Sequence, residues 1–276
     1  DELSIYKPNS VISQFNDNQF YTIDVLRYKF IKVCCSISLE INKNTNGYFD
    51  YGLKNIIDYT KQVKNDTNDV FTSIVFDSIC NIPRNFMLKN NVLYKEDMRS
   101  NFDFNGIAQG YSVDVICNFL IEKGISNYMV EIGGEVKVKG RNKEGNKWSI
   151  GLEKPTSTTA KRAFEEIVEL ENNALATSGS YRKFKEINGV KYSHAINPFT
   201  GRGVTHNLLS VTVITDDCAK ADGYATAFLV MGKEKSISHI EKQLKDENIS
   251  LFFIETDSLG NYQSSFYGGF EKYLKK

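Results

Sequence analysis

The sequence contains few of the residues that mark a metal ribbon, a membrane span or a nucleic-acid surface. Its 276 residues include five cysteines, four prolines and three histidines, and its 34 basic side chains are balanced by 34 acidic ones. Only seven of the basic residues are arginines. Because binding to phosphate backbones normally requires a basic excess, and arginine is the main residue that reads bases, this balance argues against a nucleic-acid-binding protein.

The cysteines do not form a recognisable metal or redox motif. Cys34 and Cys35 are adjacent, and no two cysteines have the CxxC spacing of zinc ribbons and thioredoxin-like sites. Apolar or helical surroundings are predicted for Cys34, Cys80, Cys117 and Cys218. We therefore expect buried thiols that act as small hydrophobic side chains.

Long apolar runs and linkers are also missing. The longest largely apolar stretch, Ala225 to Met231, is far shorter than the roughly 20 residues that cross a bilayer. The sequence has no signal peptide but opens on Asp1 rather than methionine, which we interpret as a processed or trimmed product, compatible with a removed export signal. Without a linker or short repeat, residues 1–276 are predicted to form one integrated unit, as one large domain or two joined lobes.

Apolar periodicity predicts helices and strands in the first third of the chain. A helix ending near Gly47 is predicted from residues with helical spacing, namely Ile23, Leu26, Phe30, Val33 and Ile37. A second helix is predicted at about 53–63, and strands at 71–76 and 92–94. The Asn-rich segment between these strands is predicted to be a surface loop.

The remainder alternates strands with a few helices. One helix is predicted to end near Gly124, with an apolar face formed by Ala108, Tyr111, Val115, Phe119 and Leu120. Strands are predicted at 128–132, 136–139, 148–152, 208–214 and 251–255, with a hairpin of 181–186 and 190–196 around Asn188-Gly189. Asp216 is predicted to cap a helix that ends before Gly232, and another helix follows it. This mixture predicts an α+β fold with largely antiparallel sheets flanked by helices.

Four segments carry residues suited to chemistry, and the first is DFNGIAQGYSVD, from Asp103 to Asp114. It leads directly into a predicted helix. An acidic residue before a glycine-containing turn suits helix capping, and it equally suits a phosphate or ribose site with free backbone N–H groups. The segment alone leaves both functions open.

The second segment runs from Glu131 to Glu135 and contains Gly133-Gly134. Two adjacent glycines form a tight turn between strands, or they let the backbone approach a flat ring or a phosphate closely. The pair by itself does not decide between these functions.

The third segment combines TSGSY, starting at Thr177, with HAINPFTG, from His194 to Gly201. The Asn188-Gly189 turn would pair the intervening strands and bring the two stretches together. His194 has an ordinary pKa of about 6.5 and could act as a general base or acid. A structural histidine beside a turn is the alternative.

The fourth segment places Asp222 and Thr226 four residues apart, on the same face of a predicted helix. A carboxylate and a hydroxyl offer hard oxygen ligands to Mg²⁺. Gly223 between them costs about 1 kcal/mol of helix stability relative to alanine, so a sequence built only for helix stability would avoid this arrangement. The alternative is an exposed polar face.

Taken in order, these segments resemble the motifs of the ApbE family of FAD:protein FMN transferases. Thr45-Asn-Gly-Tyr-Phe-Asp50 is similar to the family's Thr-x-Gly-x-Phe-Asp, and Asp103 to Asp114 is similar to Asp-x-x-x-Ile-Ala-Lys-Gly-Tyr-x-x-Asp. The remaining matches are Gly133-Gly134-Glu135, Thr177-Ser-Gly179, His194-x-Ile-Asn-Pro-x-Thr-Gly201 and Ala221-Asp-x-x-Ala-Thr226. The resemblance runs from about Ser10 to Gly232, and the ordered set is far more specific than any one motif.

The resemblance implies a T-fold-like domain over residues 1–276 and a defined reaction. Such enzymes bind FAD, use Mg²⁺ at its pyrophosphate and transfer FMN to a threonine of a partner protein, releasing AMP. The implied metal ligands are Asp222, Thr226 and a backbone carbonyl at Gly106. The implied flavin-binding residues are Asp103, Gln109, Gly133, Gly134, Thr177, Ser178 and Ile196. His194 is implied to be the base that activates the incoming hydroxyl.

Two departures from the family pattern bear on this expectation. Gln109 stands where many relatives have lysine, so one positive charge toward the phosphates is missing, although an amide still donates hydrogen bonds. Relatives also usually have an opening strand before the region of Tyr6 to Ser10. Its absence would leave part of the flavin pocket incomplete.

Two other functions are compatible with the same segments. Water in place of the acceptor threonine would give an FAD pyrophosphatase, and a chain without catalysis would be a flavin-binding domain. The resemblance further implies a periplasmic or cell-envelope location, a lipoprotein anchor on a removed signal, and a redox-pump or electron-transfer subunit as acceptor.

Overall fold

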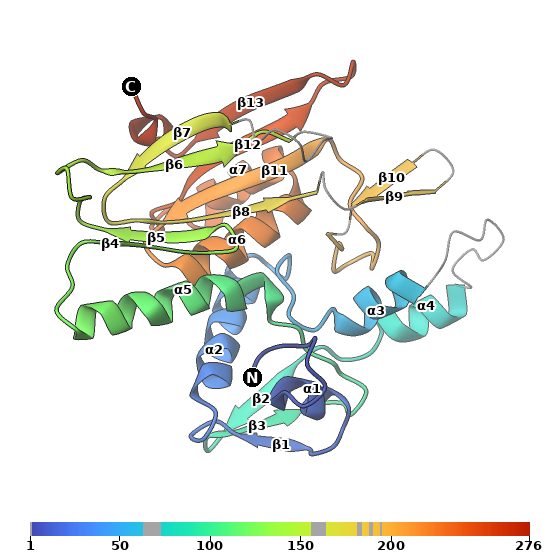
Figure 1. The fold of residues 1–276 in the computed structure, drawn as a ribbon. Coiled ribbons are helices and arrows are strands. Elements are labelled where there is room, and N and C mark those ends of the chain that lie inside the picture. The colour runs from blue at the N-terminus through green and yellow to red at the C-terminus, as the bar shows by residue number, and fades with distance from the viewer. Residues whose placement is uncertain (1, 63–72, 156–163, 181–183, 188–189, 194) are drawn as a thin grey trace.

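The computed structural model describes residues 2–62, 73–155, 164–180, 184–187, 190–193 and 195–276, and Figure 1 shows their arrangement. Its centre is a six-stranded sheet with the strand order β13-β12-β11-β8-β5-β4, in which every neighbouring pair is antiparallel. The strands are β4 (Tyr128–Ile132), β5 (Glu135–Lys139), β8 (Ala174–Gly179), β11 (Leu208–Thr215), β12 (Ser250–Thr256) and β13 (Tyr262–Tyr267). The α+β class with antiparallel sheets is thereby confirmed.

Helices cover one face of this sheet (Figure 1). They are α2 (Lys29–Asn44), α5 (Asn105–Glu122), α6 (Cys218–Met231) and α7 (Lys233–Gln243). Nearly all of α6 is buried, because it lies against β8 and β11 and is itself covered by α2 and α5. A helix buried on nearly all sides must be largely apolar or small, and the sequence CAKADGYATAFLVM is so except for Lys220, which pairs with Glu40, and the buried Asp222.

A second apolar layer covers the opposite face of the sheet. It consists of the hairpin β6 (Trp148–Glu153) and β7 (Phe164–Leu170) together with the short 3₁₀ helix η1 (Phe270–Tyr273). Phe252, Phe266 and Phe270 stack with ring centroids 5.2 to 5.7 Å apart. This cluster fixes the C-terminal part of the chain on the sheet.

The N-terminal part of the chain forms a separate three-stranded sheet, below α2 in Figure 1. Its order is β1-β3-β2, with β1 (Thr22–Asp24), β2 (Phe86–Lys89) and β3 (Val92–Lys95). Helix α1 (Val11–Asn16) lies beside this sheet, and α3 (Lys54–Gln62) packs with α4 (Ser73–Cys80) to one side of it (Figure 1). Strand β9 (Phe184–Ile187) pairs with β10 (Val190–Ser193) elsewhere. The pairing of Ile187 with Val190 leaves two residues for the predicted hairpin turn, which itself lies outside the described residues.

Three predictions in the N-terminal part are wrong. The helix predicted from Ile23 begins only at Lys29, because Ile23 lies in strand β1. The predicted strand at 71–76 overlaps helix α4, because a short apolar run fits a buried helix as well as a strand. The Asn-rich segment contains β2 and a tight turn at Asn90-Asn91, whose φ angles are 52° and 60°. Asparagine tolerates this left-handed conformation, so the two residues close a β-hairpin instead of an irregular loop.

The predicted apolar faces of two helices are right only in part: Ile37 of α2 and Ala108, Tyr111 and Leu120 of α5 pack against the core, but the fully buried positions differ. In α2 the buried residues are Ile31, Cys34, Cys35, Ser38 and Ile41, whereas Phe30 is 44% exposed. In α5 the buried residues are Ile107, Gly110, Val113, Asp114 and Cys117, whereas Phe119 is 54% exposed. Small residues at these interfaces, such as Gly110 and Cys117, allow the helices to pack closely beside larger buried side chains such as Ile107.

The cysteines behave largely as expected. All five are free, four are buried, and Cys80 is half-buried. Burial raises the pKa of Cys34 to about 12, with a smaller contribution from the charge of Glu2, so this thiol stays protonated and unreactive near neutral pH. In the parts of the chain that the structure describes, no helix has the length and apolarity of a membrane span.

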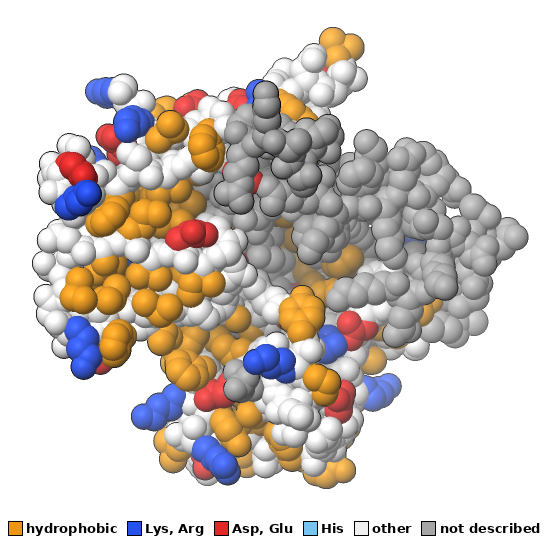
Figure 2. Space-filling view, in the orientation of Figure 1, with side chains coloured by type: hydrophobic (Ala, Val, Ile, Leu, Met, Phe, Trp, Pro, Cys, Tyr) orange, Lys and Arg blue, Asp and Glu red, His pale blue; other side chains and the backbone are white. Residues whose placement is uncertain are grey.

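Apolar side chains also gather on the surface. Figure 2 shows them over the side of the molecule formed by α5 and the β4–β7 strands. The exposed apolar residues of these elements include Ile116, Phe119, Ile121, Met129 and Ile167.

Candidate functional site

The candidate site is built where α5 crosses α6. A β-carbon at Gly110 would lie 2.3 Å from the carbonyl oxygen of Cys218, so glycine is required for this close approach of the two backbones. The approach brings the Gly110 N–H to the carboxylate of Asp222, with N and Oδ2 3.1 Å apart. Two residues separated by 112 positions are thereby joined.

Asp222 is a buried carboxylate, only 7% exposed. Burial raises its pKa to about 8, the negative charge of Glu135 adds to the rise, and the hydrogen bond from Gly110 opposes it. No basic side chain of the described segments contributes to this balance. Because burying a charge is costly unless it is paired or coordinates a metal, this environment favours a cation beside Asp222.

The hydroxyl of Thr226 lies where α6 meets β8 and α5. Thr226, one turn later in α6, has its hydroxyl 3.5 Å from the hydroxyl of Ser178 in β8. A β-carbon at Gly106 of α5 would lie 3.2 Å from Thr226 Oγ1, so the glycine leaves room at this hydroxyl. The predicted metal residues Gly106, Asp222 and Thr226 are therefore brought together.

The donor set fits Mg²⁺. The ion is commonly held by one or two carboxylates and keeps positions for water and phosphate oxygens, and this region offers hard oxygen atoms. In a regular α-helix the Gly110 N–H donates to the Gly106 carbonyl oxygen. Here the Gly110 N–H donates to Asp222, so its hydrogen bond to the Gly106 carbonyl is at most a shared one. Among the described residues, no group of three His, Cys, Asp or Glu side chains forms a metal cluster, so the site differs from zinc centres.

Gly223 has a packing role that explains its place between Asp222 and Thr226. A β-carbon there would lie 2.3 Å from Cδ1 of Ile41 in α2 and 3.1 Å from Cγ2 of Ile107 in α5. The glycine allows both neighbouring helices to pack closely on α6. The segment is therefore a buried interface, and the alternative of an exposed polar face is wrong.

Gln109 and the Gly133-Gly134 turn form the adjoining wall of the site. The Gln109 amide nitrogen donates to the carbonyl oxygen of Ile132 at 2.9 Å and also to the carboxylate of Glu135. Burial raises the pKa of Glu135 to about 7, against the lowering effect of hydrogen bonds from its own N–H and from Gln109. The turn itself has φ angles of 63° and 110°, which only glycine adopts readily.

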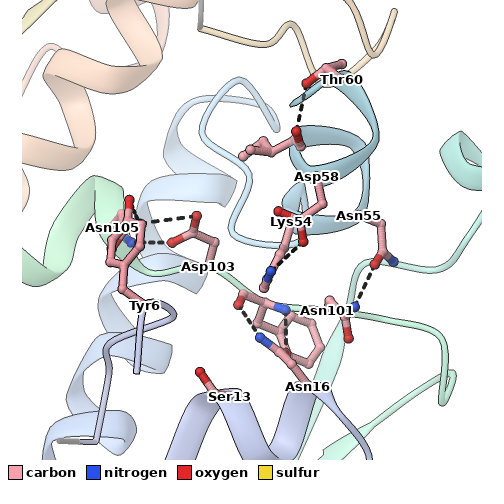
Figure 3. A network of polar contacts seen from close by, with 12 residues as sticks. Tyr6, Ser13, Asn16, Lys54, Asn55, Asp58, Thr60, Asn101, Asp103 and Asn105 are labelled. Atoms are coloured by element: carbon pink, nitrogen blue, oxygen red, sulfur yellow. Dashed lines mark hydrogen bonds and ion pairs between the residues drawn. The ribbon is translucent and has the colours of Figure 1, made fainter. Parts of the chain in front are cut away.

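Asp103 lies immediately before α5, in the polar network of Figure 3. Its Oδ1 accepts a hydrogen bond of 2.8 Å from the N–H of Asn105, whose side-chain amide also contacts the hydroxyl of Tyr6 at 3.3 Å. The buried side chain of Asn16 exchanges two hydrogen bonds, both 2.8 Å, with the backbone of Phe102. These contacts hold the start of α5. Asp103 accepts a hydrogen bond from the first N–H of the helix, as expected for capping, which was one of the two functions that the sequence allowed.

A cavity of about 670 Å³ opens beside the N-terminal half of α5. Its walls include Leu3 and Tyr6 of the N-terminal segment, Phe30 of α2, and Asn105 and Gln109 of α5. This volume is in the range of small-molecule sites, which combine apolar walls with a few polar groups. Gln109 therefore borders both the cavity and the wall formed by Glu135.

Asp114 holds the start of α6, a function that the sequence analysis missed. Its carboxylate accepts hydrogen bonds from the N–H groups of Cys218 at 3.2 Å and Ala219 at 2.9 Å, and it is 2.7 Å from the ammonium of Lys137. The predicted cap, Asp216, is wrong: the helix begins after Asp217, which makes no side-chain cap. Capping comes from another helix because α5 lies close enough at Gly110.

We expect Asp114→Asn to lower the free energy of unfolding by about 2–4 kcal/mol, because a buried ion pair is broken and a cap is weakened. Chemical denaturation monitored by circular dichroism measures this change. Asp217→Asn is the matched control, since its side chain is 57% exposed and shares the same lysine, and it should cost at most about 1 kcal/mol. Equal losses in the two variants would contradict the assigned role of Asp114.

The remaining predicted residues are not gathered at the metal residues. Thr177 contacts the hydroxyl of Thr212 at 2.8 Å, and it points away from the helix-covered face because the neighbouring Ser178 points toward α6. Ile196 packs in a separate apolar cluster with Leu53, Ile56 and Phe76. His194 lies outside the described residues, so its role stays a prediction.

The residues that the sequence analysis missed are Gly110, Asp114 and Glu135. All three lie within the sequence motifs named above, so the motifs already marked these positions. What the sequence could not supply was the partner of each: Asp222, the start of α6 and Gln109.

Comparisons with known proteins find relatives over nearly the whole chain. A relative from Vibrio cholerae named FAD:protein FMN transferase is 32% identical over 283 residues, covering 100% of this chain and 81% of the relative. One of the same name from Haemophilus influenzae is 33% identical over 261 residues, covering 92% and 74%. The apo crystal structure of the Pseudomonas stutzeri flavinyl transferase ApbE has a TM-score of 0.79 at 27% identity, covering 99% of this chain and 83% of that one.

The solved flavin transferase ApbE from Vibrio cholerae gives a similar result, with a TM-score of 0.78 at 30% identity and coverage of 99% and 85%. The family model that matches the sequence is that of the ApbE family, and it extends over residues 1–252. The resemblance seen in the ordered motifs is thus confirmed by sequence and by structure. This chain belongs to the ApbE family.

Proposed function

We propose that this chain catalyses Mg²⁺-dependent transfer of FMN from FAD to a threonine hydroxyl of a partner protein, releasing AMP. The observation that carries this proposal is the buried carboxylate of Asp222, which no basic side chain of the described residues is found to stabilise and which lies one helical turn before Thr226 in α6. The chain also belongs to the ApbE family, and relatives of the chain are named FAD:protein FMN transferase, which supports the same reaction.

In this proposal Asp222, Thr226 and the Gly106 carbonyl hold the metal. Bound there, Mg²⁺ would neutralise charge on the pyrophosphate of FAD and polarise the phosphoryl group under attack. The protein's own contribution is positioning. Gly110 and Asp114 fix α6 against α5, so that the carboxylate and hydroxyl are held before the substrate arrives.

The cavity beside α5 is the proposed position of the flavin. Tyr6 and Phe30 supply apolar walls of the kind that contact a flat ring, while Asn105 and Gln109 supply polar groups. Asp103, Gly133, Gly134, Thr177, Ser178 and Ile196 remain proposed flavin-binding residues. The acceptor is proposed to be a redox-pump or electron-transfer subunit and the chain a periplasmic or cell-envelope lipoprotein, which the family resemblance alone supports.

Incubation with FAD, Mg²⁺ and a threonine-containing acceptor peptide tests the reaction. Intact-mass analysis should show the peptide gaining one FMN, with AMP released in equal amount. AMP and free FMN without a modified peptide would instead identify an FAD pyrophosphatase. FAD binding without AMP would identify a flavin-binding domain.

We expect His194→Ala to slow FMN transfer by about 100-fold or more, because the incoming hydroxyl would lose its general base. The affinity for FAD should change less than about threefold. Single-turnover kinetics and flavin fluorescence titration measure the two quantities separately. If affinity collapses while the chemical step survives, His194 is a binding residue and the proposed base is elsewhere.

A further inference from the structure

The turn from Thr45 to Asp50, the first motif in the chain that resembles the family pattern, packs against the proposed metal residues. The hydroxyl of Thr45 accepts a hydrogen bond of 3.1 Å from the N–H of Phe49, and the Phe49 side chain is buried. A β-carbon at Gly106 would lie 3.1 Å from the Phe49 ring and 3.2 Å from Thr226 Oγ1. The turn therefore holds Phe49 beside two of the residues proposed to bind the metal.

Asp50, the last residue of this turn, forms an ion pair with Arg84, in which Oδ2 and Nη1 are 2.7 Å apart. The Gly52 N–H donates to Asp50 Oδ1 at 2.7 Å, and a β-carbon at Gly52 would lie 2.4 Å from Cβ of Arg84. The backbone after the turn thus packs directly on the arginine. The same Nη1 of Arg84 donates to the carbonyl oxygen of Pro198 at 3.1 Å, so Arg84 joins the turn to a residue 114 positions later.

The acceptor of this hydrogen bond lies in a loop, residues 195–204, that follows His194 directly in the sequence. At the base of the loop the Val204 N–H donates to the Ala195 carbonyl oxygen at 3.0 Å, and the Val204 carbonyl oxygen accepts from the Ser193 N–H at 3.1 Å. Described residues on both sides of His194 are therefore bonded to Val204. A shift of the loop would move both of these attachment points.

Apolar contacts also seat this loop on the N-terminal part of the chain. The ring of Phe199 lies edge-on to that of Tyr48, with centroids 4.9 Å apart, and a β-carbon at Gly201 would lie 2.5 Å from the ring of Phe76. Apolar contacts are not directional, whereas a guanidinium donates its hydrogens in a fixed planar geometry. Arg84 therefore adds a directional contact to a loop that apolar packing already holds on this surface.

We propose that Asp50 and Arg84 form a positioning pair for the transfer step, which holds the loop 195–204, and with it the segment that carries His194, in register with the metal residues. This inference rests on the proposed function, because it concerns the reaction of the same site. Neither residue is proposed to touch FAD or the metal. Loss of the pair should slow the reaction more than it weakens binding, since misplacing a reacting group by about 1 Å can cost on the order of 100-fold in rate.

The experiment follows single-turnover FMN transfer from FAD to the acceptor peptide in Arg84→Met and Asp50→Asn. Asparagine keeps the shape of Asp50 and an oxygen for the Gly52 N–H, so this variant tests the pair even if Arg84→Met fails to fold. Each variant should slow transfer by about 10- to 100-fold. The affinity for FAD, measured by flavin fluorescence, and for Mn²⁺, measured by electron paramagnetic resonance, should each change less than about threefold.

The double variant tests whether the two residues act through one contact. If they do, Asp50→Asn combined with Arg84→Met should transfer at about the rate of Arg84→Met alone, because the second substitution has no pair left to break. Losses that multiply in the double variant would show that the residues act independently, which contradicts the proposal.

The ion pair of Lys233 and Glu255 is the matched control. Its distance is also 2.7 Å, and its side chains are 26% and 12% exposed, against 27% and 11% for Arg84 and Asp50. It joins the start of α7 to β12. Lys233→Met and Glu255→Gln should lower stability in denaturant to a similar degree as the Arg84 and Asp50 variants, yet change the transfer rate by less than about twofold.

Transfer at the wild-type rate in both Arg84→Met and Asp50→Asn overturns the inference and leaves the proposed function intact. An equal slowing in the control pair also overturns it, because the effect would then follow stability. A loss of FAD affinity that accounts for the whole effect would make the pair part of the binding site instead. A wild-type chain that modifies no peptide overturns the proposed function, and the inference with it.

Discussion

Replacing Asp222 by alanine is expected to reduce Mg²⁺-dependent FMN transfer by at least about 1,000-fold, because the site loses its one buried carboxylate ligand. Thr226 and the Gly106 carbonyl are neutral oxygen donors, so they cannot replace the charge. Initial rates of AMP release at saturating FAD measure the effect, and Mn²⁺ binding should be lost in parallel. A variant with normal turnover would remove Asp222 from the metal site.

Asp222→Asn separates loss of charge from loss of structure. Asparagine has the same shape, and its side-chain oxygen can still accept the hydrogen bond that Gly110 donates. We therefore expect a folded protein with a melting temperature at or above that of the wild-type chain, yet a similar loss of turnover. An active asparagine variant would show that the charge is not required.

The pH dependence of stability provides an independent check on the same residue. Burial raises the pKa of Asp222 from 3.8 to about 8, so between these values the folded metal-free chain holds a proton that the unfolded chain has released. The free energy of unfolding therefore falls as pH rises through this window, and Asp222→Asn should flatten the decline. Mg²⁺ competes with the same proton, so its affinity should rise with pH up to about 8.

Gly110→Ala is expected to cost about 3 kcal/mol of unfolding free energy and most of the activity, because a β-carbon would strike the backbone of Cys218. The colliding atoms belong to the first turn of α6, so relief requires the whole helix to move. That movement would carry Asp222 away from its position. Denaturant unfolding and the rate of AMP release measure the two losses.

Gly223→Ala is the matched control for this prediction. Its β-carbon would meet side-chain atoms of Ile41 and Ile107 rather than backbone, and the helix gains up to about 1 kcal/mol from alanine. We expect a smaller loss of stability than for Gly110→Ala. If the two variants lose equal stability, the backbone contact between α5 and α6 is not what fixes the site.

Much of the fold could be predicted from local patterns in the sequence. Strands β4, β5, β6, β11 and β12 and helices α3, α5 and α6 lie close to their predicted positions, because alternation and helical spacing are local properties. The pairing of Ile187 with Val190 is likewise the one expected from the sequence pair Asn188-Gly189, which favours two-residue hairpins. The errors arose where a short apolar run suited either structure, as in α4.

The candidate site was predictable only as a set of separate motifs. The four-residue spacing of Asp222 and Thr226 indicated a shared helix face, and the ordered motifs indicated the family. The sequence did not show that Gly110 must be glycine because of Cys218, or that Asp114 caps a helix 104 residues later. Each of these facts depends on the distance between two helices.

By itself, then, the sequence determined the family, the antiparallel α+β class and the identity of the metal-binding residues that we propose, because ordered motifs and local periodicity are written along the chain. Only the tertiary structure decided which helix faces are buried, what caps α6 and which charges act on Asp222. Burial and pairing between distant residues depend on close packing, and packing selected the small residues Gly110, Cys117 and Gly223 over larger apolar ones.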